Sequence, residues 1–542
     1  MNGFYFLPLG GSNEIGMNLN LYCCDGKWLI VDLGISFSDY LGIDVVMPDI
    51  RFLEDKLKDV VGIVLTHAHE DHIGAIPHLW DKLRLPMYAT PFTAEVIRGK
   101  LKETSFKNAP LIEVPLSGKI NLRPFDIEFV TLTHSIPEPN ALAIRTKYGT
   151  VVHTGDWKID PAPLVGDVTH SKRLQEIGNE GVLALVCDST NVFQEGSAGS
   201  EGAIRDNLID VIKRYPKQRV SIACFASNIA RMETAAVAAI ETGRTIVTVG
   251  RSLEKMEMAA RHAGYLKGIP KFQNDTVIKD LSQEKTLILC TGSQGEQRAA
   301  LSRIANGAHP SIHLGAGDVV IFSARTIPGN EKHVGSIQNR LTRDGATIIT
   351  ASEEDIHVSG HPHRDELRQM YEWVRPQTLI PVHGEARHLY EHRRFGLSCG
   401  VPHSIIPNNG TLIRLSPSPA EIIDETIPVG YSVKDGSRVI AQESLLLKQR
   451  GKLAINGALF VSAAVKNKKI IGDPHFSIHG LSEPGEETGL LMLELARLLK
   501  NTLEESFKSD KERHEEIFKN LRRHCMLRFG KKPVTEIHIL DV

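Results

Sequence analysis

Short apolar runs that end in a polar residue dominate the first part of the chain. KWLIVDLG, VVGIVLTHAH, DIEFVTLTH and TVVHTGDW each end with His, Asp, Gly or a residue beside one. Buried strands are continuous apolar runs, and here they deliver polar groups from their C-terminal ends. The pattern predicts a β-rich domain over residues 1–195 whose chemistry lies at the strand ends.

The hydrophobic pattern changes after residue 195. SIACFAS precedes the helix-like NIARMETAAVAAIE, and RTIVTVG precedes RSLEKMEMAARHAG. Strands that alternate with helices indicate a parallel α/β domain, which we place at residues 196–350. Strand ends with polar tips return in HVSGHPHRDEL and LIPVHGEARHL. The first domain is therefore expected to be interrupted by the second and completed by residues 351–420.

The last part of the chain has a different composition. Residues 421–440 are expected to be a linker, and residues 441–542 a small α+β domain. A leucine-rich helix near residues 490–499 is expected to lie in the core or at an interface rather than on RNA. A basic stretch follows, for which a solvated face and an RNA contact both stay open: Arg522, Arg523, Arg528, Lys531 and Lys532.

Composition limits the class of protein. The chain has 542 residues, a net charge of −2 and 42% hydrophobic residues. No apolar run approaches the roughly 18 residues of a membrane span, and the N-terminus lacks the pattern of a signal peptide. We expect a cytoplasmic protein with no membrane partner. The net charge gives no support for a nucleic-acid partner. The seven cysteines include no CxxC pair, so a metal would need His and carboxylate ligands.

A dense group of metal-ligand residues follows the apolar run GIVL. His67, His69, Asp71 and His72 fall within six residues. His67 and His69 alternate, so in an extended backbone they project to the same side. Imidazole and carboxylate suit zinc, whose bonds to these ligands are about 2.0–2.2 Å long. The cluster predicts a metal site.

Three further positions after apolar runs complete a two-metal hypothesis. His134 closes VTLTH, Asp156 closes VVHTGD, and His383 lies in LIPVHGE. We expect one ion to be held by His67, His69 and His134, a second by Asp71, His72 and His383, and both to be bridged by Asp156. Two-metal sites with ions about 3.5–4 Å apart are typical of phosphodiester hydrolysis.

The segment THAHEDHIGA resembles the metal signature of the metallo-β-lactamase superfamily. Asp32, in IVDLG, matches the first motif of that superfamily, His134 the third and Asp156 the fourth. The resemblance implies that Asp32 is not a ligand but orients the site from behind the ligands. A simple turn aspartate is the alternative for Asp32.

A second set of motifs resembles the β-CASP nucleases, and specifically bacterial ribonuclease J. Asp188 in CDSTN, His361 in HVSGH and His383 in PVHGE match the three β-CASP motifs in order. GGSNEIGMN, CFASNIAR, TGSQGE and IPGNE extend the resemblance over the whole chain. Ala386 and the segment SARTIPGNE depart from the pattern, which leaves the shape of an RNA channel open. The resemblance implies an α/β fold in which a metallo-β-lactamase αββα sandwich is interrupted by a β-CASP domain and followed by a small α+β domain.

The resemblance also implies roles in catalysis. It places the HVSGH segment against the substrate phosphates: His357, Val358, Ser359, Gly360 and His361. Asp71, His361 and Asp188 are the expected catalytic residues. His361 would protonate the leaving oxygen as a general acid, and Asp188 would orient it. A polar turn between domains, or direct zinc ligation by His361, is the alternative.

Two polar turns of the inserted domain suggest a pocket for a phosphate. Ser227 and Asn228 follow a predicted strand and open a predicted helix, and Ser293 follows another strand in TGSQG. Helix N-termini and glycine-rich turns offer free N–H groups to anions. Such a pocket would hold a 5′-monophosphate end. Ordinary helix capping uses the same residue types and stays as the alternative.

The expected function is a ribonuclease with two Zn²⁺ ions per subunit, or Mn²⁺ in their place. The resemblance implies 5′-to-3′ exonuclease action on 5′-monophosphorylated RNA, some endonuclease action, a part in rRNA and mRNA maturation and decay, and a homodimer or homotetramer formed through the C-terminal domain. Three alternatives stay open: a nuclease acting on DNA, a hydrolase of small thioesters, and an RNA-binding scaffold with an inactive site.

Overall fold

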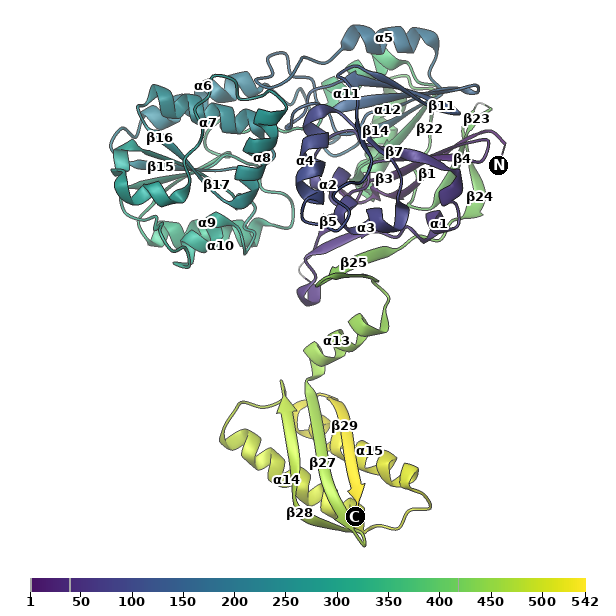
Figure 1. The fold of residues 1–542 in the computed structure, drawn as a ribbon, viewed down its shortest axis with the longest axis vertical. Helices are drawn as coiled ribbons and strands as arrows, with labels where there is room; N and C mark the ends of the chain where they lie inside the picture. Colours follow the sequence, from purple (N-terminus) through teal and green to yellow (C-terminus); the bar gives the residue numbers. More distant parts are fainter. Residues whose placement is uncertain (1, 39, 418) are drawn as a thin grey trace. The chain divides into compact units, whose positions relative to one another are not determined.

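The structure is a computed structural model that describes residues 2–38, 40–417 and 419–542. The chain forms two compact units (Figure 1). The first consists of Met1–Ser36 and Val45–Tyr431, and the second of Phe37–Asp44 and Ser432–Val542. The predicted catalytic and metal-binding residues all belong to the first unit.

Two mixed β-sheets pack face to face in the first unit. The eight-stranded sheet has the order β24 (Glu421–Thr426), β23 (Thr411–Ser416), β1 (Phe4–Gly10), β3 (Leu19–Cys24), β4 (Lys27–Val31), β7 (Val60–Val64), β8 (Met87–Ala89) and β9 (Leu111–Glu113). The seven-stranded sheet has the order β10 (Lys119–Leu122), β11 (Phe125–Thr131), β12 (Asn140–Thr146), β13 (Gly149–His153), β14 (Ala184–Asp188), β20 (Thr378–Val382) and β22 (His403–Ser404). Side chains from both sheets, such as Phe6 and Phe129, fill one core between them.

Helices cover the outer face of each sheet. The helices on the side of the eight-stranded sheet include α3 (Ile76–Leu83) and α4 (Pro91–Leu101), and α4 contacts β8 and β9. The seven-stranded sheet is covered by α5 (Ser171–Glu180), α11 (Arg364–Val374) and α12 (Ala386–Ser398), which share a second core with it. The predicted αββα sandwich is therefore confirmed.

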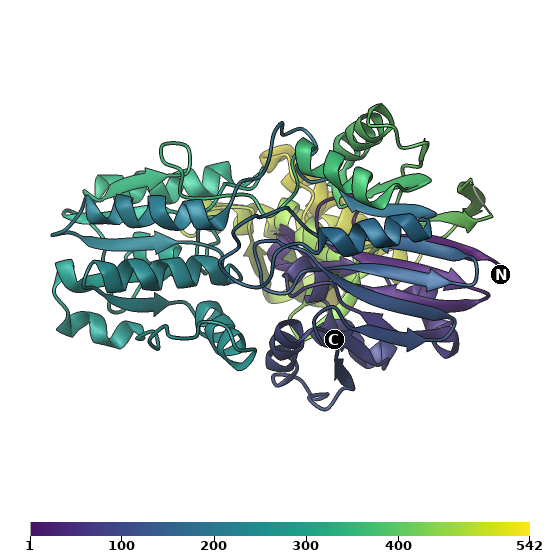
Figure 2. The ribbon, with the colours of Figure 1, turned by 90° about the horizontal axis from the view of Figure 1, so that it is seen from above.

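A second sheet domain is inserted between two neighbouring strands of the sandwich. β14 precedes the insertion, β20 follows it, and the two pair in parallel with Asp188 opposite Val382. The inserted sheet is parallel, in the order β16 (Thr245–Val249), β17 (Thr286–Cys290), β15 (Arg219–Ala223), β18 (Asp318–Phe322) and β19 (Thr347–Thr350). Helices lie on both of its faces (Figure 2): α6 (Glu201–Lys213), α7 (Ile229–Glu241), α8 (Arg251–His262), α9 (Ala300–Ala305) and α10 (Glu331–Arg343).

Residues 421–440 differ from the expected linker. Residues 421–426 form β24, which pairs antiparallel with β23 at the edge of the eight-stranded sheet. β25 (Tyr431–Asp435) and β26 (Arg438–Ala441) then form an antiparallel pair. An edge strand buries little of its side-chain surface, so its polar residues resemble those of a linker in the sequence.

The second unit has its own hydrophobic core. β28 (Lys469–His479), β27 (Ala458–Lys466) and β29 (Val534–Asp541) form a sheet in that order. α14 (Glu486–Glu504) and α15 (Asp510–Phe529) pack on one face. Within the leucine-rich helix Leu491, Leu495 and Leu499 are fully buried, whereas Leu490 is 56% exposed. α13 (Leu445–Asn456) leads into β27. None of the helices within the described ranges combines the length and the apolar character of a membrane span.

Candidate metal centre

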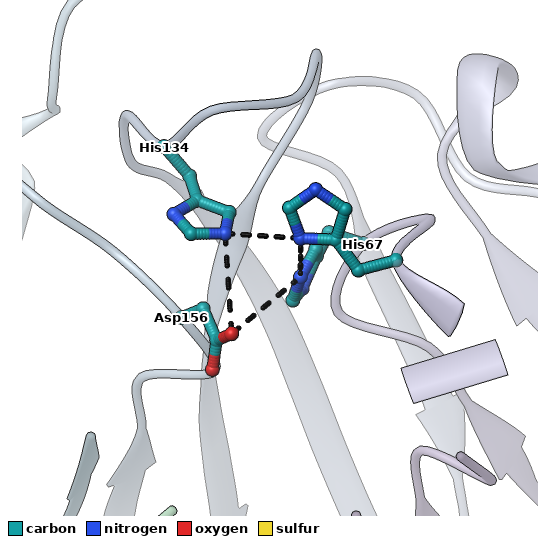
Figure 3. Close-up of side chains that lie close together, drawn as sticks. His67, His134 and Asp156 are labelled. Carbon is teal, nitrogen blue, oxygen red and sulfur yellow. Dashed lines mark hydrogen bonds and ion pairs between the residues drawn. The ribbon is translucent and has the colours of Figure 1, made fainter. Parts of the chain in front are cut away.

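Three histidines bring one ring nitrogen each to the same point in the sandwich. His67 and His69 lie between β7 and α2 (Glu70–Ile73), and His134 lies just beyond β11. The Nδ1 atom of His69 is 3.1 Å from Nε2 of His67 and 3.0 Å from Nε2 of His134. Asp156, just beyond β13, places Oδ2 at 4.0 Å from Nε2 of His67 and 3.9 Å from Nε2 of His134 (Figure 3). We call these four residues the first ligand group.

A second ligand group shares Asp156 with the first. Nε2 of His72 is 3.7 Å from Oδ2 of Asp71 and 3.2 Å from Oδ2 of Asp156. Nε2 of His383 is 3.6 Å and 3.4 Å from the same two oxygens. Within each group the ligand atoms all lie within 4.8 Å of one another. The structure thus gathers the seven predicted ligand residues into two groups that meet at one carboxylate.

The protonation of the first group suits a cation. Burial, followed by repulsion from other histidines, holds the pKa of His67 and His134 well below the usual range. Burial also lowers the pKa of His69 to about 4. The three rings are therefore neutral at pH 7 and offer lone pairs. Oδ1 of Asp156 is buried and has no hydrogen-bond partner in the described part of the chain, a costly arrangement unless a cation lies nearby.

The separations also fit a metal ion. Ligand atoms around a tetrahedral ion with bonds of about 2.0–2.1 Å lie about 3.3 Å apart. The separations quoted for the two groups run from 3.0 to 4.0 Å. Both groups therefore have the composition and the spacing to hold a divalent ion with only small side-chain adjustments.

Asp32 lies behind the second group. Its Oδ2 atom is 2.7 Å from Nδ1 of His72, the ring nitrogen that faces away from Asp156. The carboxylate also accepts hydrogen bonds from the backbone N–H and the hydroxyl of Thr66, both at 2.8 Å. Asp32 is completely buried and has a left-handed backbone with φ 64°. The contacts agree with an orienting aspartate rather than with a simple turn residue.

A glycine of the HVSGH segment fixes the orientation of His134. Nδ1 of His134 is hydrogen-bonded to the carbonyl oxygen of Gly360. This bond leaves Nε2 to face the first ligand group. A Cβ atom at position 360 would lie 2.6 Å from Cε1 of His134, so only glycine allows the approach.

Asn18 is a site residue that the sequence analysis missed. Its side-chain amide lies against Nδ1 of His383, with Oδ1 at 3.2 Å and Nδ2 at 2.9 Å, and Nδ2 is also 3.1 Å from the carbonyl oxygen of Asp71. Nε2 of His383 faces the carboxylates, so Nδ1 carries the proton and Oδ1 is its acceptor. A Cβ atom on Gly11 would meet this amide at 2.4 Å. The only sequence signal was the phrase GGSNEIGMN, whose glycines and asparagine meet here.

His361 and Asp188 form a pair beside both groups. Nδ1 of His361 is 2.7 Å from Oδ2 of Asp188, which ends β14. Oδ1 of Asp188 accepts from the backbone N–H of Thr190 at 2.8 Å and from its hydroxyl at 2.7 Å. Burial lowers the pKa of His361, but the charge of Asp188 and the hydrogen bond to it outweigh burial and raise this pKa to about 9. Asp188 therefore favours the protonated form of His361. Nδ1 of His361 also lies 4.0 Å from Oδ2 of Asp156, and Asp156, Asp188, His361 and His383 form a third group of possible ligands, so ligation by His361 stays as the alternative.

The HVSGH segment is anchored by a buried ion pair of the inserted domain. Arg231 is fully buried, contacts Glu201 at 2.8 Å and donates to the carbonyl oxygen of Ile356. His357 lies next in sequence. Burial, then the charge of Arg231, lowers its pKa to about 3, and its Nδ1 has no hydrogen-bond partner in the described ranges. Ser359 accepts a hydrogen bond from Asn191 at 2.7 Å.

The polar turns of the inserted domain do not all behave alike. Asn228 caps α7 by accepting from the N–H of Arg231 at 2.9 Å, and its amide donates to Glu201 at 3.3 Å. The capping alternative therefore accounts for the Asn228 side chain. Ser293 is buried, and its hydroxyl has no partner among the described residues. Ser227 follows β15, and Ser293 follows the neighbouring parallel strand β17, so both lie at the same edge of the sheet.

Family models match four successive parts of the chain. Residues 20–176 match the metallo-beta-lactamase superfamily, and residues 217–341 match the ribonuclease J beta-CASP domain. Residues 349–396 match the Zn-dependent metallo-hydrolase RNA specificity domain, and residues 445–542 match the ribonuclease J C-terminal domain. These matches follow the order of the domains in the structure.

Curated relatives are similar over nearly the whole chain. Ribonuclease J of Sinorhizobium meliloti is 42% identical, over 99% of this chain and 97% of the relative. Ribonuclease J 1 of Streptococcus pyogenes is 36% identical, over 92% of this chain and 90% of the relative. A crystal structure of a protein of unknown function from Enterococcus faecalis has a TM-score of 0.53 at 16% identity, over 76% of this chain and 100% of that one, and it bears on the fold alone.

Proposed function

The chain belongs to the ribonuclease J family and is a metal-dependent ribonuclease, and we propose that it is a two-metal 5′-to-3′ exonuclease that favours RNA with a 5′-monophosphate. We further propose some endonuclease activity and a cytoplasmic part in rRNA and mRNA maturation and decay. The observation that carries the two-metal proposal is the pair of ligand groups joined at Asp156.

We assign one metal ion to each ligand group. His67, His69 and His134 would hold the first ion, Asp71, His72 and His383 would hold the second, and Asp156 would be available to both. Zn²⁺ is the proposed metal because the ligands are imidazoles and carboxylates, and Mn²⁺ is the alternative that the same ligands accept. When bound, two such ions supply an activated water and stabilise negative charge on the phosphate oxygens. Asp71 and Asp156 contribute only two negative charges, so the centre stays positive toward a phosphodiester.

The chain supplies the proton for the leaving oxygen. His361 is the proposed general acid, because Asp188 holds Nδ1 at 2.7 Å, which leaves Nε2 to donate a proton. Asp188 positions this ring and stabilises its charged form. The raised pKa of His361, about 9, keeps the proton in place at neutral pH until the leaving oxygen takes it.

The proposed pocket for the 5′-monophosphate lies between the HVSGH segment and the turns of the inserted domain. Ser293 and His357 each have an unpartnered polar atom in the described part of the chain, and Ser227 lies at the same sheet edge as Ser293. Val358 and Gly360 would contribute backbone groups. A phosphate held there would place the first linkage of the RNA at the metal centre, which gives release of mononucleotides from the 5′ end.

One digestion experiment tests this proposal. The same RNA sequence is prepared with a 5′-monophosphate and with a 5′-triphosphate, and DNA of that sequence is included. The proposal expects mononucleotide release that depends on the monophosphate, is absent with DNA and is lost in His72→Ala. His403→Ala, which changes an exposed histidine on β22, is the matched control and should leave the rate unchanged.

Other outcomes would redirect the proposal. Equal cleavage of DNA and RNA would indicate a nuclease that acts on both, rather than an enzyme specific for RNA. Absence of cleavage by the metal-loaded wild type would favour a small thioester substrate or an RNA-binding scaffold. Cleavage without a preference for the monophosphate would contradict the proposed pocket for the 5′ end, but it would not count against the two-metal centre.

We also propose that the second unit mediates assembly into a homodimer or homotetramer. The face of its sheet opposite α14 and α15 carries the exposed apolar side chains of Phe460, Ile471 and Leu540. Light scattering of the wild type and of Phe460→Asp tests this, and a monomeric wild type would overturn it.

A further inference from the structure

The second unit carries an excess of positive charge. Residues 432–542 contain more Lys and Arg than Asp and Glu, although the whole chain has a net charge of −2. Several of the arginines of this unit are neutralised. Arg528 pairs with Glu494, Arg513 with Asp541, and Arg450 with Asp435. What matters for a partner is therefore the set of cations that no carboxylate neutralises.

Five such cations form one continuous surface, which we call the basic strip. It comprises Lys448, Lys452, Arg522, Lys531 and Lys532. Among the described residues none of the five forms an ion pair, and the four lysines are exposed. Like charges that lie together without a counter-charge repel one another, and they also concentrate anions at the surface.

Hydrogen bonds join the parts of the basic strip. Lys448, Lys452 and Asn456 are spaced by four residues on α13, so they lie along one face of that helix. The side chain of Asn456 accepts from the backbone N–H of Lys532 at 3.3 Å, and Arg522 of α15 donates to the carbonyl oxygen of Lys532 at 3.4 Å. The strip therefore runs from α13 across the turn before β29 to α15, at the end of the sheet where β27 and β29 begin (Figure 1).

We propose that the basic strip is a second RNA-binding surface that holds the phosphate backbone of the substrate at a distance from its reacting 5′ end. This inference rests on RNA being the substrate. Exposed lysines suit sequence-independent contacts to phosphates, which is what an enzyme that proceeds along any RNA requires. An acidic protein would also be attracted to such a surface. The proposed substrate, however, is itself a polyanion that is longer than the few nucleotides a metal centre can hold.

Salt-dependent binding tests the proposal on the full chain. Affinity for a fluorescent RNA of about 30 nucleotides is measured in the His72→Ala background between about 50 and 300 mM KCl. Neutralising Lys448, Lys452, Lys531 and Lys532 together to Gln should weaken binding at least tenfold at about 150 mM salt. It should also reduce the slope of log affinity against log salt by about 3, since each phosphate contact of a single strand contributes about 0.7.

A matched variant controls for net charge. Lys466, Lys468, Lys469 and Lys508 lie at or near the opposite end of the same sheet: Lys466 pairs with Lys469 across the β27–β28 turn, and Lys468 bonds to Ser506. Changing these four lysines to Gln removes the same charge. This control variant should keep the wild-type affinity and slope. Equal losses in both variants, or no loss in the strip variant, would overturn the proposal.

Two further measurements separate this inference from the proposed function. Cleavage of an RNA of about four nucleotides with a 5′-monophosphate should be the same in the strip variant and the wild type, because the proposal assigns to the strip only nucleotides beyond those at the reacting 5′ end. Failure of the wild type on that RNA would count against the exonuclease, not against the strip. Unchanged RNA affinity in the strip variant, together with lost binding of poly-glutamate, would assign the strip to an acidic protein and overturn the RNA proposal.

Discussion

Substitution of Asn18 tests whether this residue orients His383 in the second ligand group. The amide accepts from the N–H of His383 and donates to the carbonyl oxygen of Asp71, and its Nδ2 atom also lies 3.1 Å from Nε2 of His72, so it touches three residues of the second ligand group. Asn18→Leu keeps a similar volume but removes these polar contacts. His383 then has no acceptor for its outward proton, and its ring is free to turn away from Asp156.

The expected magnitude follows from these contacts. Loss of the partner that orients one ligand typically weakens metal binding 10- to 100-fold. That loss corresponds to about 1.4–2.7 kcal/mol in the binding free energy of one ion. The first ligand group does not contact Asn18, so it should keep its affinity. Asn18→Leu should therefore bind one ion normally and the second ion 10- to 100-fold more weakly.

A metal titration against a chelator of known affinity measures both sites, and thermal melting at each metal concentration reports the same binding independently. Asn20→Leu is the control, because Asn20 is buried in β3 opposite Val31 and bonds to none of the described ligand residues. If Asn18→Leu binds two ions with wild-type affinity, or loses both ions equally, the orienting role of Asn18 is refuted.

Three further predictions concern other parts of the first unit. Asp188→Asn should return the pKa of His361 from about 9 toward its ordinary value near 6.5; kcat at pH 8 should then fall about 30-fold with little change at pH 6, and a uniform loss across the pH profile would contradict this. Ser293→Ala should reduce the preference for 5′-monophosphate over 5′-hydroxyl RNA about tenfold in kcat/KM and leave cleavage of 5′-hydroxyl RNA unchanged; an unchanged preference would exclude Ser293 from the pocket. Burial raises the pKa of Glu128, but hydrogen bonds from two arginines lower it to about 2, below the unfolded value near 4.5. Glu128 therefore stabilises the fold above that unfolded value, and this contribution is lost as the pH falls through about 2. In urea unfolding, the difference in stability between wild type and Glu128→Gln should be largest at pH 7 and should shrink to about half by pH 3, and a difference independent of pH would contradict this.

The sandwich and its insertion could be predicted from the sequence because both depend on local patterns. Apolar runs such as GIVL become buried strands, and the change to strand–helix units marks the inserted parallel sheet. The edge strand β24 could not be predicted in the same way. Among the described strands β24 pairs with β23 only, so its other edge has no neighbouring strand. The pattern of its side chains therefore does not differ from that of a linker.

The metal ligands could be predicted from the sequence, whereas some of the residues that anchor the segments around them could not. His67 to His72 lie close in sequence, and His134, Asp156 and His383 come just after strands, where a sheet collects its polar groups. Arg231 and Glu201 have no such signal. They are an ordinary pair of helix residues in the sequence, and only burial of both side chains shows that they anchor the segment before His357. A buried pair of this kind depends on tertiary contacts that no local pattern encodes.

Four of the five ligand histidines are oriented by acceptors that come from separate parts of the chain. A ring that offers one nitrogen to a metal carries its proton on the other, and that proton needs an acceptor. The acceptors are Asn18 for His383, Asp32 for His72, Thr66 for His67 and Gly360 for His134. Because three of the four rings have an acceptor from a distant segment, ligand geometry follows from the completed fold and not from the ligand cluster alone. The Gly360 contact has a further consequence, since the segment that supplies it also contains His361. A displacement of that segment would disturb a ligand of the first group and the proton donor together, which couples the metal centre to the segment expected to hold the substrate.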